Sequence, residues 1–202
     1  RGDVAKGMNA PESSFVDVAV NEYGIYAVLD QAKGRIFLYD FDGNLINIFG
    51  QNGNVAGHFK QPGAIAWAED KLLVTDRTLN QVFVFEMTDF GRAALGATEH
   101  YYYGNWAQSA DYAKEALRLN ANYDLAYVNL GKYYLMKDDY STAMYYFRLG
   151  NDRSFYSKAF NGYRSQWIES HFSVIITVLG VLIFALIYSE MKYHRGRGQS
   201  GS

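Results

Sequence analysis

The stretch FSVIITVLGVLIFALIYS, from Phe172 to Ser189, is uncharged throughout and decides where the rest of the chain lies. A helix rises about 1.5 Å per residue, so these residues extend roughly 27 Å, which is close to the thickness of the hydrocarbon core of a bilayer. The core helix of a soluble domain carries a polar face, whereas this stretch offers only three small hydroxyl side chains and one glycine. We therefore predict one membrane-spanning helix over residues 172–189.

The flanks of this helix predict its orientation. The downstream flank is basic and contains Lys192, His194, Arg195 and Arg197. The upstream flank mixes Arg164 with Glu169. Because basic residues favour the cytoplasmic side of a membrane, we expect residues 190–202 to form a cytoplasmic basic tail and linker. The N-terminal domains are then extracytoplasmic, on a protein that crosses the cell membrane once.

Residues 1–13 read as an irregular leader segment. The opening RGDVAKGMNA has neither an initiator Met nor an apolar stretch, so it is not a signal peptide. Either a leader has been removed or the chain begins within a longer protein. The absence of cysteine from the sequence agrees with a non-reducing compartment.

Composition excludes one class of partner. A net charge of -2 and a charged share of 20% create no field that would attract nucleic acid. The 18 Tyr and 13 Phe raise the aromatic share to 17%, which is typical of binding surfaces and repeat interfaces. We therefore expect protein partners and membrane lipid, and no nucleic acid.

An internal repeat organises residues 14–88. A shift of 46 residues aligns IFLYD (36–40) with VFVFE (82–86), and Asp30 with Asp76. Short apolar strands are expected at 16–20, 25–29, 35–40, 45–49, 64–68, 72–75 and 81–86. The turn Asp42-Gly43-Asn44 between two of them is a strong hairpin signal. A strand repeat with a period in the forties is typical of propeller blades.

Three segments carry a resemblance to a known family. YAVLDQAKGRIFLYDFDGNLINIFGQNG (26–53), GHFKQPGAIAW (57–67) and LLVTDRTLNQVFVF (72–85) resemble the NHL repeat, with its Gly-x-Phe-x-x-Pro opening and its Asp-Gly turn. The resemblance implies an NHL-type β-propeller, of which residues 14–88 hold one blade and most of a second. Such propellers close with about six blades. We therefore expect earlier blades outside this sequence, or another polypeptide that covers the open edge.

Residues 89–152 carry a second, helical repeat. AYVNLGKYYLMKDDYSTAMYYFRLG (126–150) places small and aromatic residues at the signature positions of the 34-residue tetratricopeptide repeat, and a weaker copy precedes it. Two TPR-like helix pairs are expected, at 89–103 with 106–119 and at 123–136 with 140–149. A capping helix over 153–171 then leads into the membrane. The predicted fold class is multidomain: a partial all-β propeller, α-helical hairpins and one transmembrane helix.

Arrays of helix pairs present a surface to partner segments, so the tyrosine-rich runs are candidate contacts. The predicted partner-binding residues are Tyr101, Tyr102, Tyr133, Tyr134 and Tyr145. Small side chains in the membrane helix would let another helix approach closely. The predicted packing residues there are Ser173, Gly180 and Ala185.

No residue pattern points to catalysis, so we expect no enzyme, no catalytic residue, no cofactor and no metal. The four histidines lack the paired spacing of a ligand set, and no nucleophile elbow, Walker loop or cysteine is present. Asp30 and Asp76 recur at strand ends, where we expect them to cap turns rather than bind a ligand. Asp17, Asp40 and Asp42 are interpreted as turn and surface residues.

The order of NHL repeats, tetratricopeptide repeats and a spanning helix is similar to a bacterial family of surface proteins, in which a Yip-type membrane domain can follow. That resemblance implies an association with carbohydrate ABC transporters. The predicted function is a membrane-anchored extracytoplasmic scaffold that docks protein or glycan partners, as an accessory subunit beside a transporter permease. The alternative is the C-terminal part of an NHL-propeller metal-dependent lyase or lactonase whose catalytic blades are absent.

Overall fold

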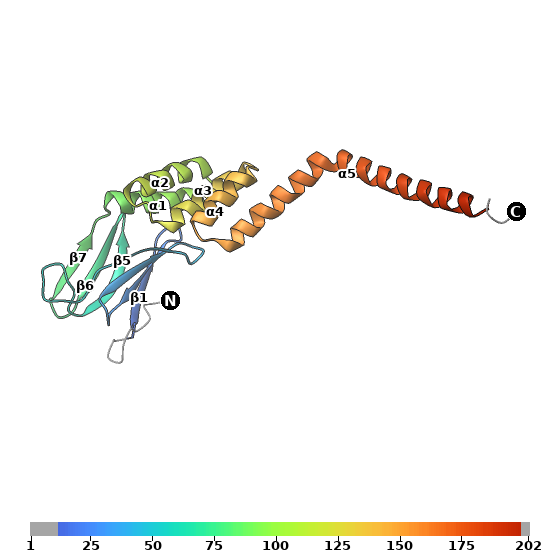
Figure 1. Ribbon diagram of the computed structural model, residues 1–202. Helices are drawn as coiled ribbons and strands as arrows, with labels where there is room; N and C mark the ends of the chain where they lie inside the picture. The colour runs from blue at the N-terminus through green and yellow to red at the C-terminus, as the bar shows by residue number, and fades with distance from the viewer. Residues whose placement is uncertain (1–11, 199–202) are drawn as a thin grey trace.

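A computed structural model describes residues 12–198. Two small antiparallel sheets come first in the chain and five helices follow them. Both sheets lie on one side of the helices, and the last helix projects far from the rest of the molecule (Figure 1). Most of the expected leader, residues 1–11, and the end of the expected tail, residues 199–202, lie outside the described residues.

The first sheet has four strands in sequence order: β1 (Phe15–Val20), β2 (Tyr26–Asp30), β3 (Arg35–Tyr39) and β4 (Leu45–Phe49). The second has three: β5 (Pro62–Ala68), β6 (Lys71–Asp76) and β7 (Gln81–Phe85). All neighbours pair antiparallel, so in the first sheet Val28 lies opposite both Val18 and Phe37. The strand positions expected from the alternation of apolar residues are confirmed to within two residues.

The predicted Asp-Gly hairpin turn is present between β3 and β4. Gly43 has a φ of +84°, a left-handed conformation that glycine adopts without strain. The carboxylate of Asp40 accepts hydrogen bonds from the N–H groups of Asp42, at 3.0 Å, and Asn44, at 2.7 Å. The turn residues predicted from the sequence therefore close this hairpin.

The two sheets are joined along β1 and β5. The Ile65 N–H donates to the Asp17 carboxylate at 2.8 Å, and the Trp67 indole N–H donates to the Ala19 carbonyl at 3.2 Å. Phe59, which is fully buried, packs edge-on against Phe83 of the second sheet. Asp17, which we interpreted as a surface residue, is instead a link between the sheets.

Four helices form an antiparallel stack in which each contacts the next: α1 (Asp89–Tyr102), α2 (Trp106–Leu119), α3 (Asp124–Met136) and α4 (Tyr140–Leu149). Their boundaries follow local chemistry. Thr88 and Asp139 cap α1 and α4 by accepting hydrogen bonds from the N–H groups of Gly91 and Thr142. Sequence analysis located these helices to within a residue of their ends.

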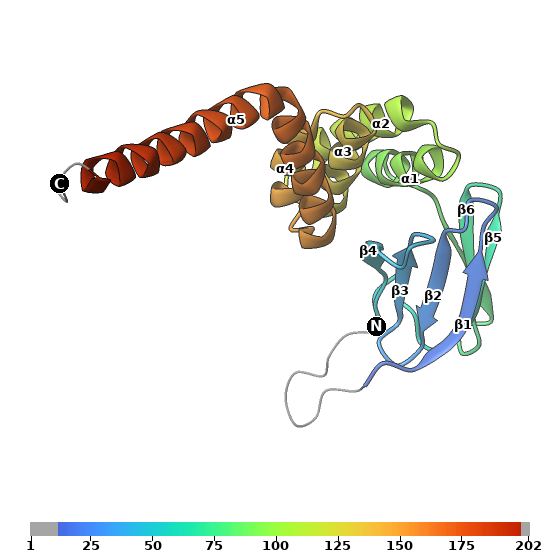
Figure 2. The same ribbon diagram turned by 90° about the vertical axis from the view of Figure 1, so that its right-hand side faces the viewer.

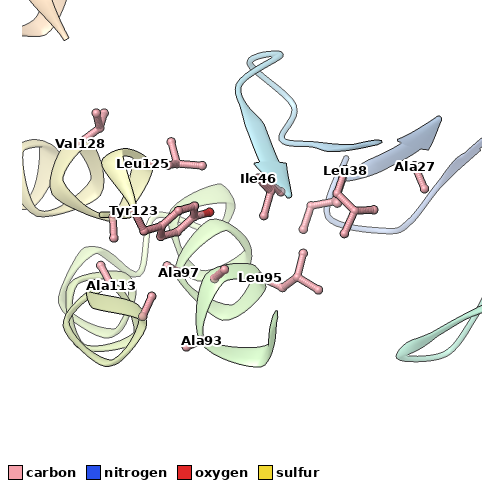
Figure 3. Packing of buried hydrophobic residues seen from close by; sticks show 14 of the residues in the cluster. Ala27, Leu38, Ile46, Ala93, Leu95, Ala97, Ala113, Tyr123, Leu125 and Val128 are labelled. Carbon is pink, nitrogen blue, oxygen red and sulfur yellow. The ribbon is translucent and has the colours of Figure 1, made fainter. Parts of the chain in front are cut away.

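A hydrophobic core joins the stack to the first sheet. Leu95 of α1 points toward Leu38 of β3 and Ile46 of β4, and all three are buried (Figure 3). Tyr123 and Leu125, at the start of α3, close the other side of this contact (Figure 3). The sheets and the stack therefore share one core rather than forming separate bodies.

The last helix, α5 (Arg153–Gly198), is a single continuous element of 46 residues. It begins against α4, leaves the stack and bends partway along its length (Figure 2). We expected a separate capping helix over 153–171 and a spanning helix over 172–189. Nothing in the sequence between them, neither Pro nor a polar turn, interrupts the backbone hydrogen bonding of the helix, so the two predicted helices are one.

The predicted fold class is wrong. The described residues hold two small open sheets of four and three strands followed by five helices, an α+β arrangement with no closed propeller. They also do not reproduce the expected layout of propeller, helical hairpins, cap and separate span, because α1 packs on the first sheet and α5 is continuous. Repeat motifs specify strands, turns and helix pairs, whereas the higher arrangement depends on contacts between distant segments.

Candidate functional site

A group of tyrosines lies at the contact between α3 and α4. Rings of Tyr134 and Tyr146 stack across the two helices with centroids 5.4 Å apart. Tyr133 and Tyr145 extend this pair on either side, with centroid distances of 5.2 and 5.3 Å. We call these four residues the tyrosine surface. Tyr145 is 51% exposed and the other three are half-buried, so the phenol groups remain accessible.

Close helix packing positions these rings. Gly131 of α3 lies directly against the ring of Phe147 of α4, and Phe147 and Ala143 are fully buried beside it. The absence of a side chain at Gly131 lets α4 approach α3 closely. This approach brings Tyr146 within stacking distance of Tyr134.

One member of the tyrosine surface, Tyr146, has a shifted pKa. Burial raises the pKa of Tyr146, and the neighbouring phenols of Tyr134 and Tyr145 raise it further, whereas the Lys114 ammonium on α2 opposes the shift. Neutral phenols both donate and accept hydrogen bonds and offer flat apolar faces. Such a group suits the recognition of a polypeptide or a sugar ring.

A hollow of about 380 Å³ borders the tyrosine surface at the end of the stack where α1 meets α2 and α3 meets α4. Trp106, Tyr133, Met136 and Lys137 are among its lining residues. Met136 is 58% exposed there. Adaptable methionine and flat aromatic rings are enriched at protein contact sites.

The predicted residues Tyr101 and Tyr102 do not join this surface. Both rings pack on Phe41 of the first sheet, at centroid distances of 5.6 and 5.2 Å. Tyr101 also meets Trp106 edge-on at 4.9 Å. They therefore hold the stack on the sheet, whereas the other predicted residues, Tyr133, Tyr134 and Tyr145, belong to the tyrosine surface.

Lys132 was missed by sequence analysis. Its ammonium lies 4.0 Å from the centroid of the Tyr101 ring and 5.0 Å from that of Phe155, and 3.7 Å from a carboxylate oxygen of Asp42. Only 3% of Lys132 is exposed. The sequence did contain a sign that Lys132 is unusual, because this lysine follows Gly131 in the middle of an otherwise uncharged helical stretch.

The recurring aspartates serve as turn caps, as predicted. Asp76 accepts hydrogen bonds from the N–H groups of Lys60, Gln61, Thr78 and Leu79. Asp30 accepts two from Ser14 and Lys33. Among the described residues, no three His, Asp or Glu side chains lie close enough together to hold a metal ion.

Two larger clefts flank the sheets. One of about 490 Å³ lies between both sheets and α1, with Phe49, Phe85 and Leu95 in its wall. The other, of about 700 Å³, has an acidic wall that includes Glu22 and Glu99. Burial, and then the charge of Glu22, raise the pKa of Glu99. Neither cleft contains a residue that we predicted as a binding residue.

The helix α5 is long and apolar enough to span a membrane. An 18-residue window within Arg153–Tyr188 has a mean hydropathy of 2.4 and is not buried by any other described part of the chain. Ser173 and Gly180 are two helical turns apart on one side, and no described atom lies within 4 Å of a Cβ placed at Gly180. Ala185 is five residues further on and therefore faces another direction. The three predicted packing residues do not form a single stripe.

Comparisons with known proteins show no family for this chain. No family model and no curated protein matches it. A solved structure described as the computationally designed Ika4 protein matches with 16% identity and a TM-score of 0.30. The match covers 43% of this chain, which spans about half (49%) of the designed protein. A likeness at this level carries no argument about fold or function.

Proposed function

We propose that this chain is a membrane-anchored docking protein that binds a protein partner through its tyrosine surface. The group of four phenol rings at the junction of α3 and α4, one exposed and three half-buried, carries the proposal. Tyrosine delivers large contact area with little loss of rotamer freedom, which makes it a frequent anchor of protein interfaces. The adjoining hollow beside Met136 would receive an apolar side chain of the partner.

Anchoring follows from α5. Its apolar side chains between residues 172 and 188 are exposed almost throughout, an arrangement that water disfavours and lipid accepts. The basic residues that follow the span favour a cytoplasmic C-terminus, so the sheets and the stack would lie on the other side of a cell membrane. A partner in the membrane could pack against the side of α5 that carries Ser173 and Gly180.

Orientation is tested on cysteine variants, because this sequence has no cysteine. Asn122→Cys places a thiol in the stack, and Gly198→Cys places one after the span. In intact cells, a membrane-impermeant maleimide should label the first variant and reach the second only after permeabilisation. The opposite pattern would show that the stack is cytoplasmic, and would contradict the proposed orientation.

Docking is tested by site-specific photo-crosslinking of the full chain in its native membrane. A photoreactive phenylalanine at Tyr145 should give a discrete adduct, whereas one at Tyr103 should not. Tyr103 is a matched control, because it is 58% exposed but packs beside Tyr23 and Tyr102 near the sheet.

The same adduct tests the energetic role of the surface. Tyr134→Ala, with the crosslinker at Tyr145, should weaken adduct formation by roughly five- to thirtyfold, because truncating an interface anchor costs about 1–2 kcal/mol. Equal crosslinking from Tyr145 and Tyr103 would mean that the tyrosine surface is not a specific docking site. An adduct with a polysaccharide instead of a protein would show that the partner is a glycan, and the proposed class of partner would be wrong.

A further inference from the structure

The part of α5 between the stack and the span has two different sides. One side packs on α4: Ala159 is fully buried, Phe155 stacks on Phe147 with centroids 5.4 Å apart, and Gly162 lies against the ring of Tyr140. The helix therefore remains docked on the stack for its first three turns. A second side, roughly a quarter of the way around the helix axis from this contact, is exposed.

This exposed side carries an aromatic stripe. Phe160, Tyr163 and Trp167 are spaced three and four residues apart, which places them on one side of a helix. They are 44%, 41% and 48% exposed. Arg164 is exposed between them, and Trp167 stacks on His171 with centroids 4.5 Å apart. Water disfavours such a run of exposed rings, so the stripe requires a partner.

The position of the stripe selects the partner. Trp167 precedes the apolar stretch that begins at Phe172 by five residues, or about 7.5 Å along the helix. The headgroup layer on each side of a bilayer is roughly 5–8 Å thick. Tryptophan and tyrosine concentrate in that layer, and an arginine there can bond to lipid phosphates. The surface nearest to the stripe is therefore the membrane that the same helix spans.

An upright straight helix would not place all three rings in the headgroups. Phe160 lies twelve residues before Phe172, about 18 Å along the helix, and would stand in water. However, α5 bends partway along its length, so its first part runs in a different direction from its last part (Figures 1 and 2). With the last part across the bilayer, an oblique first part brings Tyr163 and Phe160 closer to the surface.

We infer that the stripe of Phe160, Tyr163 and Trp167 lies in the lipid headgroup layer of the membrane that α5 spans. The stack then rests against the membrane instead of standing away from it. Ser165 and Glu169, on the other side of the helix, face water. This inference rests on the proposed anchoring by α5 and adds a second, lateral contact with lipid.

Nitroxide spin labels on the full chain test the inference, since any introduced cysteine is unique. Three variants are reconstituted separately into phosphatidylcholine vesicles that contain phosphatidylglycerol. Tyr163→Cys reports on the stripe, and Ser165→Cys reports on the other side of the same turn. Gly180→Cys, whose surroundings are open, reports on the span. The readout is the accessibility of each label to oxygen, which enters lipid, relative to a water-soluble nickel chelate.

We expect the ratio of oxygen accessibility to nickel-chelate accessibility to be highest for the label at Gly180. The ratio at Tyr163 should be lower than at Gly180 but several-fold higher than at Ser165. If Tyr163 matches Ser165 while Gly180 lies in lipid, the anchoring stands and the inference fails. If the Gly180 label is also water-exposed, the anchoring itself fails. A Tyr163 label that is shielded from both reagents, or whose spectrum sharpens on dilution with unlabelled chain, would show that protein or a second copy covers the stripe, and would overturn the inference.

Discussion

Asp76 shows how a single buried carboxylate organises a turn. Four backbone N–H groups, from Lys60, Gln61, Thr78 and Leu79, donate to its two oxygens. Burial alone would raise the pKa of Asp76, but these four donors favour the charged form and hold the pKa below its ordinary value of 3.8. The same residue therefore closes two loops of the second sheet at once.

Asp76→Asn should lower the free energy of unfolding by about 2 kcal/mol at neutral pH. The NH₂ group of the amide cannot accept hydrogen bonds from the backbone N–H groups that it would face, so these groups would lose their partners. A depressed pKa adds stability that is present above the ordinary value of 3.8 and is lost as the pH falls through the folded-state value. The gap between wild type and variant should therefore shrink below about pH 4.

Chemical unfolding of the full chain in detergent, followed by circular dichroism at several pH values, measures this gap. Asp70→Asn is the control, because Asp70 is an exposed neighbour on the same hairpin. If the difference in unfolding free energy between wild type and Asp76→Asn stays constant from pH 7 to the lowest pH measured, the role assigned to the Asp76 charge is contradicted.

At the scale of elements, the α3–α4 contact determines the tyrosine surface. A Cβ at Gly131 would come within 2.6 Å of the ring carbons of Phe147, which is fully buried. The two helices cannot keep their present separation with any larger residue there. Stacking of Tyr134 on Tyr146 depends on that separation.

Gly131→Ala should destabilise the stack by about 1–2 kcal/mol, because overpacking outweighs the gain of roughly 1 kcal/mol in helix propensity. It should also change the near-ultraviolet circular dichroism of the tyrosines. Gly91→Ala in α1 is the matched control, since its Cβ would meet only ordinary contacts, the shortest at 3.4 Å. If both variants have equal stability, Gly131 is not required for close packing.

At the scale of the whole molecule, Lys132 joins three parts that are distant in the sequence. It belongs to α3, its ammonium faces Asp42 of the first sheet and the ring of Tyr101 from α1, and it also approaches Phe155 at the start of α5. Asp42 keeps 47% of its side chain exposed, so the ion pair is buried only on the lysine side.

Lys132→Ala should therefore lower the unfolding free energy by about 2–4 kcal/mol, because it leaves a cavity and removes the cation–π contact. Lys132→Met should cost clearly less, since methionine fills the space and water can solvate the released Asp42. Thermal unfolding of the full chain in detergent compares the two. Equal losses for both variants would show that the charge, and not the packing, is what Lys132 contributes.

The local elements were predictable because each depends on neighbours in the sequence. Alternating apolar residues and the turn at Gly43 predicted the strands, and the 34-residue repeat pattern predicted the helix pairs. The arrangement of those elements was not predictable. Tyr101 and Tyr134 look alike in the sequence, yet one packs on the sheet and the other belongs to the tyrosine surface. Only contacts between distant segments separate them.

The continuity of α5 links the position of the stack to the position of the proposed spanning part. A helix of 46 residues is about 69 Å long, and its apolar part continues without a break in the helix from the part that is seated on α4. The end of the helix that is seated on the stack begins near Phe155, beside Lys132. A membrane protein that tilts the proposed spanning part of α5 would move the whole stack with it. Events within the bilayer would then change the direction in which the sheets point.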